Sequence, residues 1–269
     1  MKELKGSVVA LTGAASGIGR SLAINLAREG CSLALADIDQ EGLEQTAEMI
    51  NDKGIKVTIH FLDVADREKV YQFAKDVVGE HGKVNMIINN AGVAMSDTLE
   101  DVTYEDLEWL LGINLWGIIY GSTAFLPYLK QQPEGHIVNI SSVNGLFTWR
   151  NNGPYCTSKF AVRGFTLTLC QELKDTAVCV SCVHPGGIKT NIVRNARFIK
   201  APDPEMSHDE SVEYFDTKMA RTSADKAARV IIKGIKKNRS RILVGFDAHI
   251  IDVLQRLFPV MFQKLAALL

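Results

Sequence analysis

The sequence predicts an α/β protein in which a doubly wound parallel sheet lies between two layers of helices. Two observations lead to this prediction. Short apolar runs alternate with segments whose apolar residues recur at helical spacing, through the first two-thirds of the chain. The runs are continuously apolar rather than alternating, which indicates strands covered on both faces. Repeated strand–helix units of this kind form parallel sheets with right-handed crossovers.

The expected elements follow one another closely, and Gly30 ends the first helix. Strands are expected at residues 7–13, 32–37, 56–63, 84–92, 136–142, 177–186 and 241–245. Helices are expected at residues 17–30, 41–54, 66–82, 103–130, 154–174 and 223–238. Ser223 is the expected N-cap of the last helix.

No linker, repeat or low-complexity segment divides the chain, so a single Rossmann-like domain over residues 1–269 is expected. The alternation of strand and helix patterns stops at residues 187–222, which are polar, aperiodic and contain two prolines. A loop of this length inside a compact domain commonly has a function. We interpret it as a substrate-loop insertion.

Residues 247–269 form a hydrophobic C-terminal extension. Asp252, Arg256 and Pro259 interrupt it, so two short amphipathic helices are expected rather than one membrane-spanning helix. Three placements stay open, in decreasing order of preference: a roof over the substrate pocket, a subunit interface, or peripheral contact with a membrane surface.

The composition argues against several partners and compartments. The chain has 46% hydrophobic and 23% charged residues and a net charge of -1, which gives no general attraction to nucleic acid or an anionic membrane. Its start lacks the apolar run of a signal peptide, and five scattered cysteines fit a reducing compartment, so a cytoplasmic location is expected. Cys179 and Cys182 have C-x-x-C spacing, but an offset of three in a strand points the thiols to opposite faces. No second cluster completes a zinc site, so no metal is expected.

A glycine-rich turn, "TGAASGIG", lies between the first strand and the first helix. Its glycines, Gly13, Gly17 and Gly19, permit a tight turn and let the backbone approach a pyrophosphate, which rests on the free N–H groups of the helix N-terminus. A P-loop interpretation fails because no G-K-[ST] follows. The turn therefore predicts dinucleotide binding, with Ser16 and Ile18 also in the cofactor site.

Carboxylates and amides at strand ends extend this predicted site. Asp37 ends the second strand, where a carboxylate hydrogen-bonds the adenosine ribose hydroxyls and repels a 2′-phosphate. The residues after it offer no Arg or Lys, so NAD is favoured over NADP, while Asp39 better suits a helix N-terminus. The cofactor site is also expected to include Asp63, Val64 and Asn90, at the carboxyl ends of the third and fourth strands.

The spacing Tyr-x-x-x-Lys occurs twice, at Tyr155/Lys159 and at Tyr71/Lys75. Ser142 follows the fifth strand and precedes Tyr155 by 13 residues, so a loop can bring both hydroxyls onto one substrate oxygen. No serine-bearing strand end precedes Tyr71, whose pair is interpreted as a helix-face contact. His184, directly before a proline at a strand end, is interpreted as structural.

Six motifs together resemble the series found in the short-chain dehydrogenases/reductases. They are "TGAASGIG", "NNAG", Asn114, "NISS", "YCTSK" and "PGGIKT", in family order over about residues 6–190. The resemblance implies a Rossmann-like NAD(P)-dependent oxidoreductase acting on CH–OH groups. It also implies a homodimer or homotetramer formed through the helices that begin near Thr103 and Pro154.

The resemblance assigns the acid–base roles. Tyr155 is expected to act as base in alcohol oxidation and as acid in the reverse direction, with its pKa lowered by the Lys159 ammonium and by oxidised nicotinamide. Tyr155 and Lys159 also contact the cofactor, since the lysine holds the nicotinamide ribose. Ser142 stabilises the substrate oxygen, while Ser141 packs at the strand end.

Three further residues complete the expected site. Asn114 would hold a water that links Lys159 to solvent; alternatively it satisfies a neighbouring backbone group. Thr190 would hydrogen-bond the nicotinamide carboxamide, with Ile188 beside it in the cofactor site.

The expected substrate pocket is lined by residues 143–152, residues 93–95 and the loop after Gly187. Its larger side chains, Met95, Phe147, Trp149 and Phe198, indicate an apolar alcohol or ketone. The predicted function is hydride transfer between NAD(H) and a secondary alcohol or ketone. An NADPH-dependent carbonyl reductase and a non-catalytic NAD(H)-binding sensor or scaffold are the alternatives.

Overall fold

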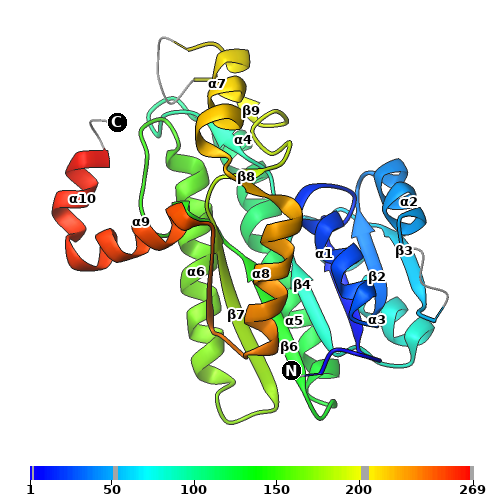
Figure 1. Cartoon of the computed structure of the whole chain (residues 1–269). Coiled ribbons are helices and arrows are strands. Elements are labelled where there is room, and N and C mark those ends of the chain that lie inside the picture. The colour runs from blue at the N-terminus through cyan, green and yellow to red at the C-terminus, as the bar shows by residue number, and fades with distance from the viewer. Residues whose placement is uncertain (2, 51–53, 201–205, 267–269) are drawn as a thin grey trace.

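The computed structural model describes residues 1, 3–50, 54–200 and 206–266. Seven parallel strands form the central sheet in the order β11-β7-β6-β4-β1-β2-β3 (Figure 1). The order reverses at β1, so the crevice beside the carboxyl ends of β1 and β4 is the point where open α/β sheets bind their ligands. The predicted doubly wound α/β fold is confirmed.

The elements agree with the expected ones to within a few residues at each end. The strands are β1 (Val8–Thr12), β2 (Ser32–Asp37), β3 (Val57–Phe61), β4 (Met86–Asn89), β6 (Gly135–Ile140), β7 (Val178–Pro185) and β11 (Arg241–Val244). The covering helices are α1 (Gly17–Arg28), α2 (Gln40–Glu48), α3 (Arg67–His81), α4 (Tyr104–Leu111), α5 (Gly117–Leu129), α6 (Gly153–Glu172) and α8 (Ala224–Lys236). The exception is the helix expected at 41–54, which ends at Glu48, six residues early, with Met49 and Ile50 already outside the helix; residues 51–53 lie outside the described residues.

Alternate residues of each strand enter two separate cores. In β1, Val9 and Leu11 pack with residues of α1 and α8 on one face, while Val8 and Ala10 pack with α3, α5 and α6 on the other. This is why the strands read as continuously apolar. The three layers position the carboxyl ends of the strands at one edge of the molecule, which Figure 1 shows toward α4 and β8.

The helix expected at 103–130 consists of α4, a π-helical turn η1 (Gly112–Trp116), and α5. Thr103 caps it, since its hydroxyl accepts the Asp106 N–H at 3.1 Å. By length and composition the stretch Tyr104–Leu129 is able to cross a membrane. Its inner side chains, Phe125 among them, are buried against the sheet, as in the core helix of a globular protein.

Residues 187–222 contain more regular structure than the sequence indicated. The short elements are β8 (Ile188–Lys189), β9 (Arg197–Phe198), α7 (His208–Tyr214), η3 (Phe215–Met219) and β10 (Thr222–Ser223), and residues 201–205 lie outside the described part. β9 pairs with β5 (Met95–Ser96), some hundred residues earlier, which local periodicity does not reveal. Arg197 stacks 3.6 Å from the Trp109 ring and pairs with Asp106 at 2.7 Å, so the segment is fixed onto α4.

The C-terminal extension forms two helices, α9 (Phe246–Leu257) and α10 (Pro259–Ala266), while residues 267–269 lie outside the described part. Their inner side chains Ile251 and Phe262 pack with Phe147 and Trp149, in the segment that follows Ser142. Asp247 accepts the Gly187 N–H at 2.7 Å and Asp252 pairs with Arg241. The extension is therefore anchored to the end of the substrate-loop segment and to β11.

All five cysteines are free thiols. Cys182 is buried and Cys179 is half-buried, as an offset of three along β7 requires. Within the described ranges, no three His, Cys, Asp or Glu side chains are grouped to hold a metal ion.

Two buried histidines are expected to make the protein acid-sensitive. Burial lowers the pKa of His136 to about 3 and that of His184 to about 4, against 6.5 in an unfolded chain. Above pH 6.5 both histidines are neutral in the folded and the unfolded chain, and the free energy of unfolding keeps its full value. As the pH falls below 6.5 the free energy of unfolding decreases, because only the unfolded chain then takes up protons. Each should lower the free energy of unfolding by about 2 kcal/mol at pH 5. Urea unfolding at pH 7 and pH 5 measures this, and an unchanged pH dependence in His136→Gln/His184→Gln would refute it.

Candidate active site

Three side chains predicted to act together lie where β6 ends and α6 begins. Ser142 follows β6, and its hydroxyl accepts the Asn144 N–H at 3.1 Å, which caps a 3-10 turn, η2 (Val143–Gly145). Tyr155 and Lys159 lie one helical turn apart on α6, with the lysine Nζ 5.6 Å from the centre of the tyrosine ring. The structure thus brings Ser142, Tyr155 and Lys159 together, as the sequence predicted.

The electrostatics of this cluster differ from the expectation. Burial raises the pKa of Tyr155 to about 12, although a hydrogen bond with the Ser142 side chain acts in the opposite direction. Burial also lowers the pKa of Lys159 to about 8. For the chain's own residues the pKa of Tyr155 is therefore raised rather than lowered, because burial removes the phenolate from water. The lowering expected from oxidised nicotinamide stays a prediction. The phenol is protonated at neutral pH.

Lys159 reaches the site through a narrow space beside the "NNAG" segment. Its Nζ donates to the carbonyl oxygen of Ile140 at 3.3 Å. A Cβ built on Gly92 would lie 3.4 Å from that Nζ and 3.2 Å from Asn114 Oδ1. Glycine at position 92 therefore allows the lysine and the asparagine to approach the same stretch of backbone.

Asn114 lies in the π-helical turn η1, a type of helix distortion frequent at functional sites. Its Oδ1 accepts the Val93 N–H at 2.8 Å, and its Nδ2 donates to the Val93 carbonyl at 2.9 Å and to Ser158 Oγ at 3.2 Å. The backbone-satisfying alternative is thus present in the structure. Oδ1 has a second lone pair, and both Oδ1 and the Lys159 Nζ lie beside Gly92.

His184 contacts the site, although only a structural role was predicted for it. Its Nδ1 lies 3.0 Å from the Ser142 carbonyl oxygen. The lowered pKa keeps the imidazole neutral at pH 7, so the Nδ1 hydrogen donates to that carbonyl. β7 pairs with β6 so that Val183 lies opposite Ile140, which brings His184 next to the segment that begins with Ser142. This register is the information that would have identified the contact.

The glycine turn has the geometry that a dinucleotide requires. Gly13 and Gly17 have φ of +67° and +52°, which glycine adopts without strain, and a Cβ on Gly13 would lie 2.8 Å from the Ala91 backbone. Asn90 Nδ2 donates to the Gly13 carbonyl at 3.0 Å and fixes the turn. Ser16, exposed at the N-terminus of α1, makes no side-chain cap, so the first N–H groups of α1 receive no hydrogen bond from that side chain and remain available to an anion beside the glycine turn. These residues fit a pyrophosphate group.

Thr190 belongs to the same region of the structure. A Cβ on Gly17 would lie 3.1 Å from Thr190 Cγ2, so the residue that follows β8 lies against the glycine turn. Ile188 is buried next to it, and Ile18 is half-buried in the first turn of α1. These residues, distant in sequence, thus lie together beside the glycine turn.

The residues predicted at the ribose end also lie at strand ends. Asp37 Oδ2 accepts the Ala15 N–H at 3.0 Å, which joins β2 to the glycine turn. Asp39 caps α2 by accepting the Gly42 N–H at 2.9 Å, as expected for it. Asp63 is exposed after β3, and Val64 packs against the start of α5 at Gly117.

Arg20 is a residue whose place the sequence did not reveal. Its guanidinium crosses from α1 to α2 and donates to the Ala15 carbonyl and to Gln45 Oε1, while its Nε donates to Thr46 Oγ1 at 3.0 Å. Arg20 and Asp37 therefore both bond to the backbone of Ala15, although residues 38–49 contain no cation.

The second Tyr-x-x-x-Lys pair lies elsewhere. Tyr71, on the exposed face of α3, hydrogen-bonds to Thr123 Oγ1 of α5 at 3.2 Å. It is a contact between helix surfaces, in line with the interpretation of its sequence.

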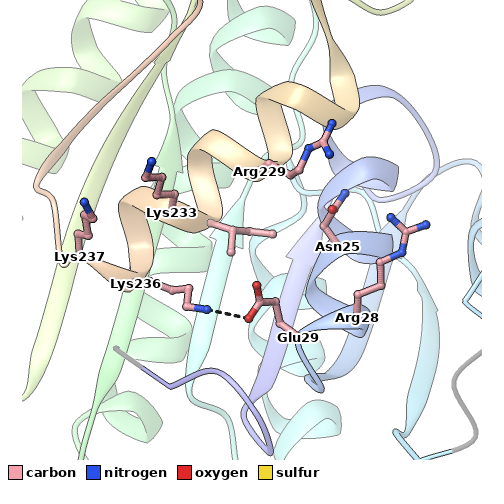
Figure 2. Close-up of a pocket in the computed structure, with 8 residues that line it drawn as sticks. Asn25, Arg28, Glu29, Arg229, Lys233, Lys236 and Lys237 are labelled. Atoms are coloured by element: carbon pink, nitrogen blue, oxygen red, sulfur yellow. Dashed lines mark hydrogen bonds and ion pairs between the residues drawn. The ribbon is translucent and has the colours of Figure 1, made fainter.

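A surface groove of about 470 Å³ lies between α1 and α8, away from this site (Figure 2). It is lined by Asn25, Arg28, Glu29, Arg229, Ile232, Lys233, Lys236 and Lys237. Glu29 pairs with Lys236 at 2.8 Å, and Arg229 pairs with Asp225. Since it holds no activated hydroxyl and flanks one face of the sheet, the groove is not the reaction site.

Comparison with known proteins identifies this arrangement. The family described as short chain dehydrogenase matches residues 7–199, which include the glycine turn, Ser142, Tyr155 and Lys159. The chain is a short-chain dehydrogenase. The predicted family and its enzyme class, an NAD(P)-dependent oxidoreductase acting on CH–OH groups, are confirmed.

Several named oxidoreductases and dehydrogenases resemble the chain over most of their length. SadH of Mycobacterium tuberculosis, named as an oxidoreductase, is 40% identical over 269 residues, 99% of this chain and 96% of its own. Estradiol 17-beta-dehydrogenase 11 of Homo sapiens is 30% identical and matches 96% of this chain and 81% of its own. A short-chain dehydrogenase/reductase of Burkholderia phymatum, solved in complex with NAD, superposes with a TM-score of 0.87 at 28% identity, covering 98% of this chain and 97% of its own.

Proposed function

We propose that this short-chain dehydrogenase transfers a hydride between NAD(H) and a secondary alcohol or ketone of apolar character. The observation that supports this most strongly is the cluster of Ser142, Tyr155 and Lys159 beside a glycine turn shaped for a pyrophosphate. A panel of secondary alcohols and ketones, followed by the absorbance of the reduced cofactor, tests the proposal. NAD binding without turnover of any of them would instead support the non-catalytic sensor or scaffold.

The chain's own residues supply proton transfer and charge stabilisation. A bound nicotinamide ring would supply or accept the hydride. Tyr155, protonated at neutral pH, donates its proton to the oxygen of a ketone, and the Ser142 hydroxyl stabilises the charge that develops on that oxygen. For alcohol oxidation Tyr155 must lose its proton, which requires positive charge beyond that of Lys159 because burial holds its pKa high. Oxidised nicotinamide carries such a charge.

Proton exchange with solvent is assigned to Lys159 and Asn114. The lysine ammonium, with its pKa lowered to about 8, is protonated at pH 7 and still able to release a proton. The remaining lone pair of Asn114 Oδ1 lies near it and suits a relay water. We also assign the nicotinamide ribose to Lys159 and the carboxamide to Thr190, which lies against the glycine turn.

Asp37 is proposed to select NAD over NADP. Asp37→Ala should lower the ratio of kcat/KM with NAD to that with NADP by about tenfold or more, because a carboxylate no longer repels the 2′-phosphate and Arg20 lies nearby. Steady-state kinetics with both cofactors measure the ratio. Glu44→Ala, an acid further along α2, is the matched control and should leave it unchanged. An unaltered ratio in Asp37→Ala would remove Asp37 from this role.

The alternative is an NADPH-dependent carbonyl reductase, and the position of Arg20 is the observation that favours it. An alcohol dehydrogenase of Thermococcus sibiricus with 26% identity and a TM-score of 0.74 was solved with 5-hydroxy-NADP. A wild-type preference for NADPH in the same kinetics would establish this alternative.

An apolar substrate is proposed from the side chains that border the site. Phe147 and Trp149 lie edge to face at 4.8 Å in the segment after Ser142, and Phe262 of α10 stacks near them at 5.5 Å. We propose that residues 187–222 act as the substrate loop and residues 247–269 as the wall beyond it, within one catalytic domain over residues 1–269. A relative named for estradiol is consistent with a hydrophobic alcohol.

A homodimer or homotetramer through α5 and α6 is also proposed. Trp116 and Phe160 are exposed, and Trp116 stacks on Tyr120 at 5.7 Å, which gives this helix pair an apolar outer surface. Light scattering of the purified protein measures the mass, and a monomer would contradict the proposal. The free thiols agree with a cytoplasmic location.

A further inference from the structure

The outer face of α9 and its junction with α10 carry exposed apolar side chains. Phe246, Ile250, Val253 and Leu257 recur at spacings of four, three and four, so they form one stripe along α9. Phe246 is 80% exposed and Leu257 is 65% exposed. Figure 1 shows both helices as an arm beside α6 at the edge of the molecule. At about 100° per residue the stripe lies on the side of α9 opposite Ala248 and Ile251, which pack inward.

The stripe continues into the junction between α9 and α10, residues 257–261, which we call the α9–α10 corner. Five successive residues, Leu257 to Met261, are all exposed, with Val260 at 68%. Leu257 ends α9, Phe258 is non-helical (φ −134°, ψ 58°), and Val260 and Met261 lie in the first turn of α10, so these side chains point in several directions. Exposed apolar side chains that point in several directions suit insertion among acyl chains.

The charges on this arm have one sign at its surface. Arg256 and Lys264 are exposed on either side of the corner. The only carboxylates between Phe246 and Lys264 are Asp247 and Asp252. Asp247 accepts the Gly187 N–H, and Asp252 is buried, where it pairs with Arg241 and also lies 3.8 Å from the exposed guanidinium of Arg256. The surface therefore combines apolar and basic groups without an exposed acid.

We infer that the α9–α10 corner binds peripherally to anionic lipid bilayers. Amphipathic helices with this combination lie in the lipid interface, with apolar side chains among the acyl chains and cations at the anionic headgroups. The net charge of -1 gives the molecule as a whole no such attraction, so the binding is local to this arm. It does not depend on the reaction proposed above.

The test is flotation of the purified full-length protein with vesicles of phosphatidylcholine alone or mixed with phosphatidylglycerol. Wild type should float with the mixed vesicles and much less with phosphatidylcholine alone. The double variant Leu257→Asp/Met261→Asp should bind the mixed vesicles more weakly than wild type by about tenfold or more. Arg256→Gln/Lys264→Gln should lose the preference for phosphatidylglycerol. Met49→Asp, at an equally exposed methionine on the opposite side of the sheet, should bind as wild type does.

All of these changes are at exposed side chains, and circular dichroism with the molar mass from light scattering checks that each variant is folded. Wild-type protein that floats with neither vesicle would overturn the inference. Equal flotation of wild type and Leu257→Asp/Met261→Asp would do the same. A corner variant that changes the molar mass while vesicle binding stays as in wild type would assign the surface to a contact between copies of this chain instead.

Discussion

Tyr155→Phe is expected to lower kcat/KM by about 10³-fold while the NAD dissociation constant stays within about threefold of the wild-type value. The phenylalanine keeps the ring that fills the space beside Lys159 but has no proton to give or take. The loss should appear in both directions of the reaction, since the same group is acid in one and base in the other. Steady-state kinetics and calorimetric titration with NAD measure the two quantities.

The second Tyr-x-x-x-Lys pair provides the control for this experiment. Tyr71→Phe removes a hydroxyl that contacts only the neighbouring helix at Thr123, so kcat/KM should be unchanged. Retained turnover in Tyr155→Phe, or an equal loss in both variants, would refute the assignment of Tyr155 as the acid–base group.

Gly19→Ala is expected to weaken NAD binding by about 100-fold or more, because the glycine turn would have to change shape. A Cβ at this position would lie 1.8 Å from the Gly13 carbonyl oxygen and 2.7 Å from Asn90 Nδ2. The first contact is with backbone, which no side-chain rotation relieves. The turn that receives the pyrophosphate must therefore open. Titration calorimetry measures the affinity, and circular dichroism reports whether the fold is kept.

Gly79→Ala is the matched control for this prediction. Gly79 lies on the exposed side of α3, and a Cβ there meets nothing within 4 Å. Alanine should raise the free energy of unfolding by about 1 kcal/mol and leave NAD binding unchanged. A folded Gly19→Ala protein with wild-type affinity would contradict the proposed role of the turn.

The central sheet and its crossing helices could be predicted from the sequence because each face of each strand is apolar and each helix has its own period. β1 illustrates this, with Val9 and Leu11 in one core and Val8 and Ala10 in the other. The pairing of β5 with β9 could not be predicted, since it joins two-residue segments about a hundred residues apart. Such contacts leave no periodic signal.

The candidate site shows the same division. The positions of Ser142, Tyr155 and Lys159 follow from spacing and strand order. The contact of His184 with the Ser142 carbonyl depends on the register of β6 and β7, and the approach of Arg20 to α2 depends on how two helices pack. The direction of the Tyr155 pKa shift depends on how completely the phenol is removed from water, a quantity that only the folded structure contains.

The most direct test of the proposed function follows the hydride itself. A secondary alcohol that turns over in the panel is prepared with deuterium on its carbinol carbon and incubated with the enzyme and NAD. The reduced cofactor is then analysed by mass spectrometry. We predict one deuterium at the nicotinamide for each ketone formed, and none with Tyr155→Phe over the same time. Ketone formed without deuterium in the cofactor would contradict hydride transfer to NAD.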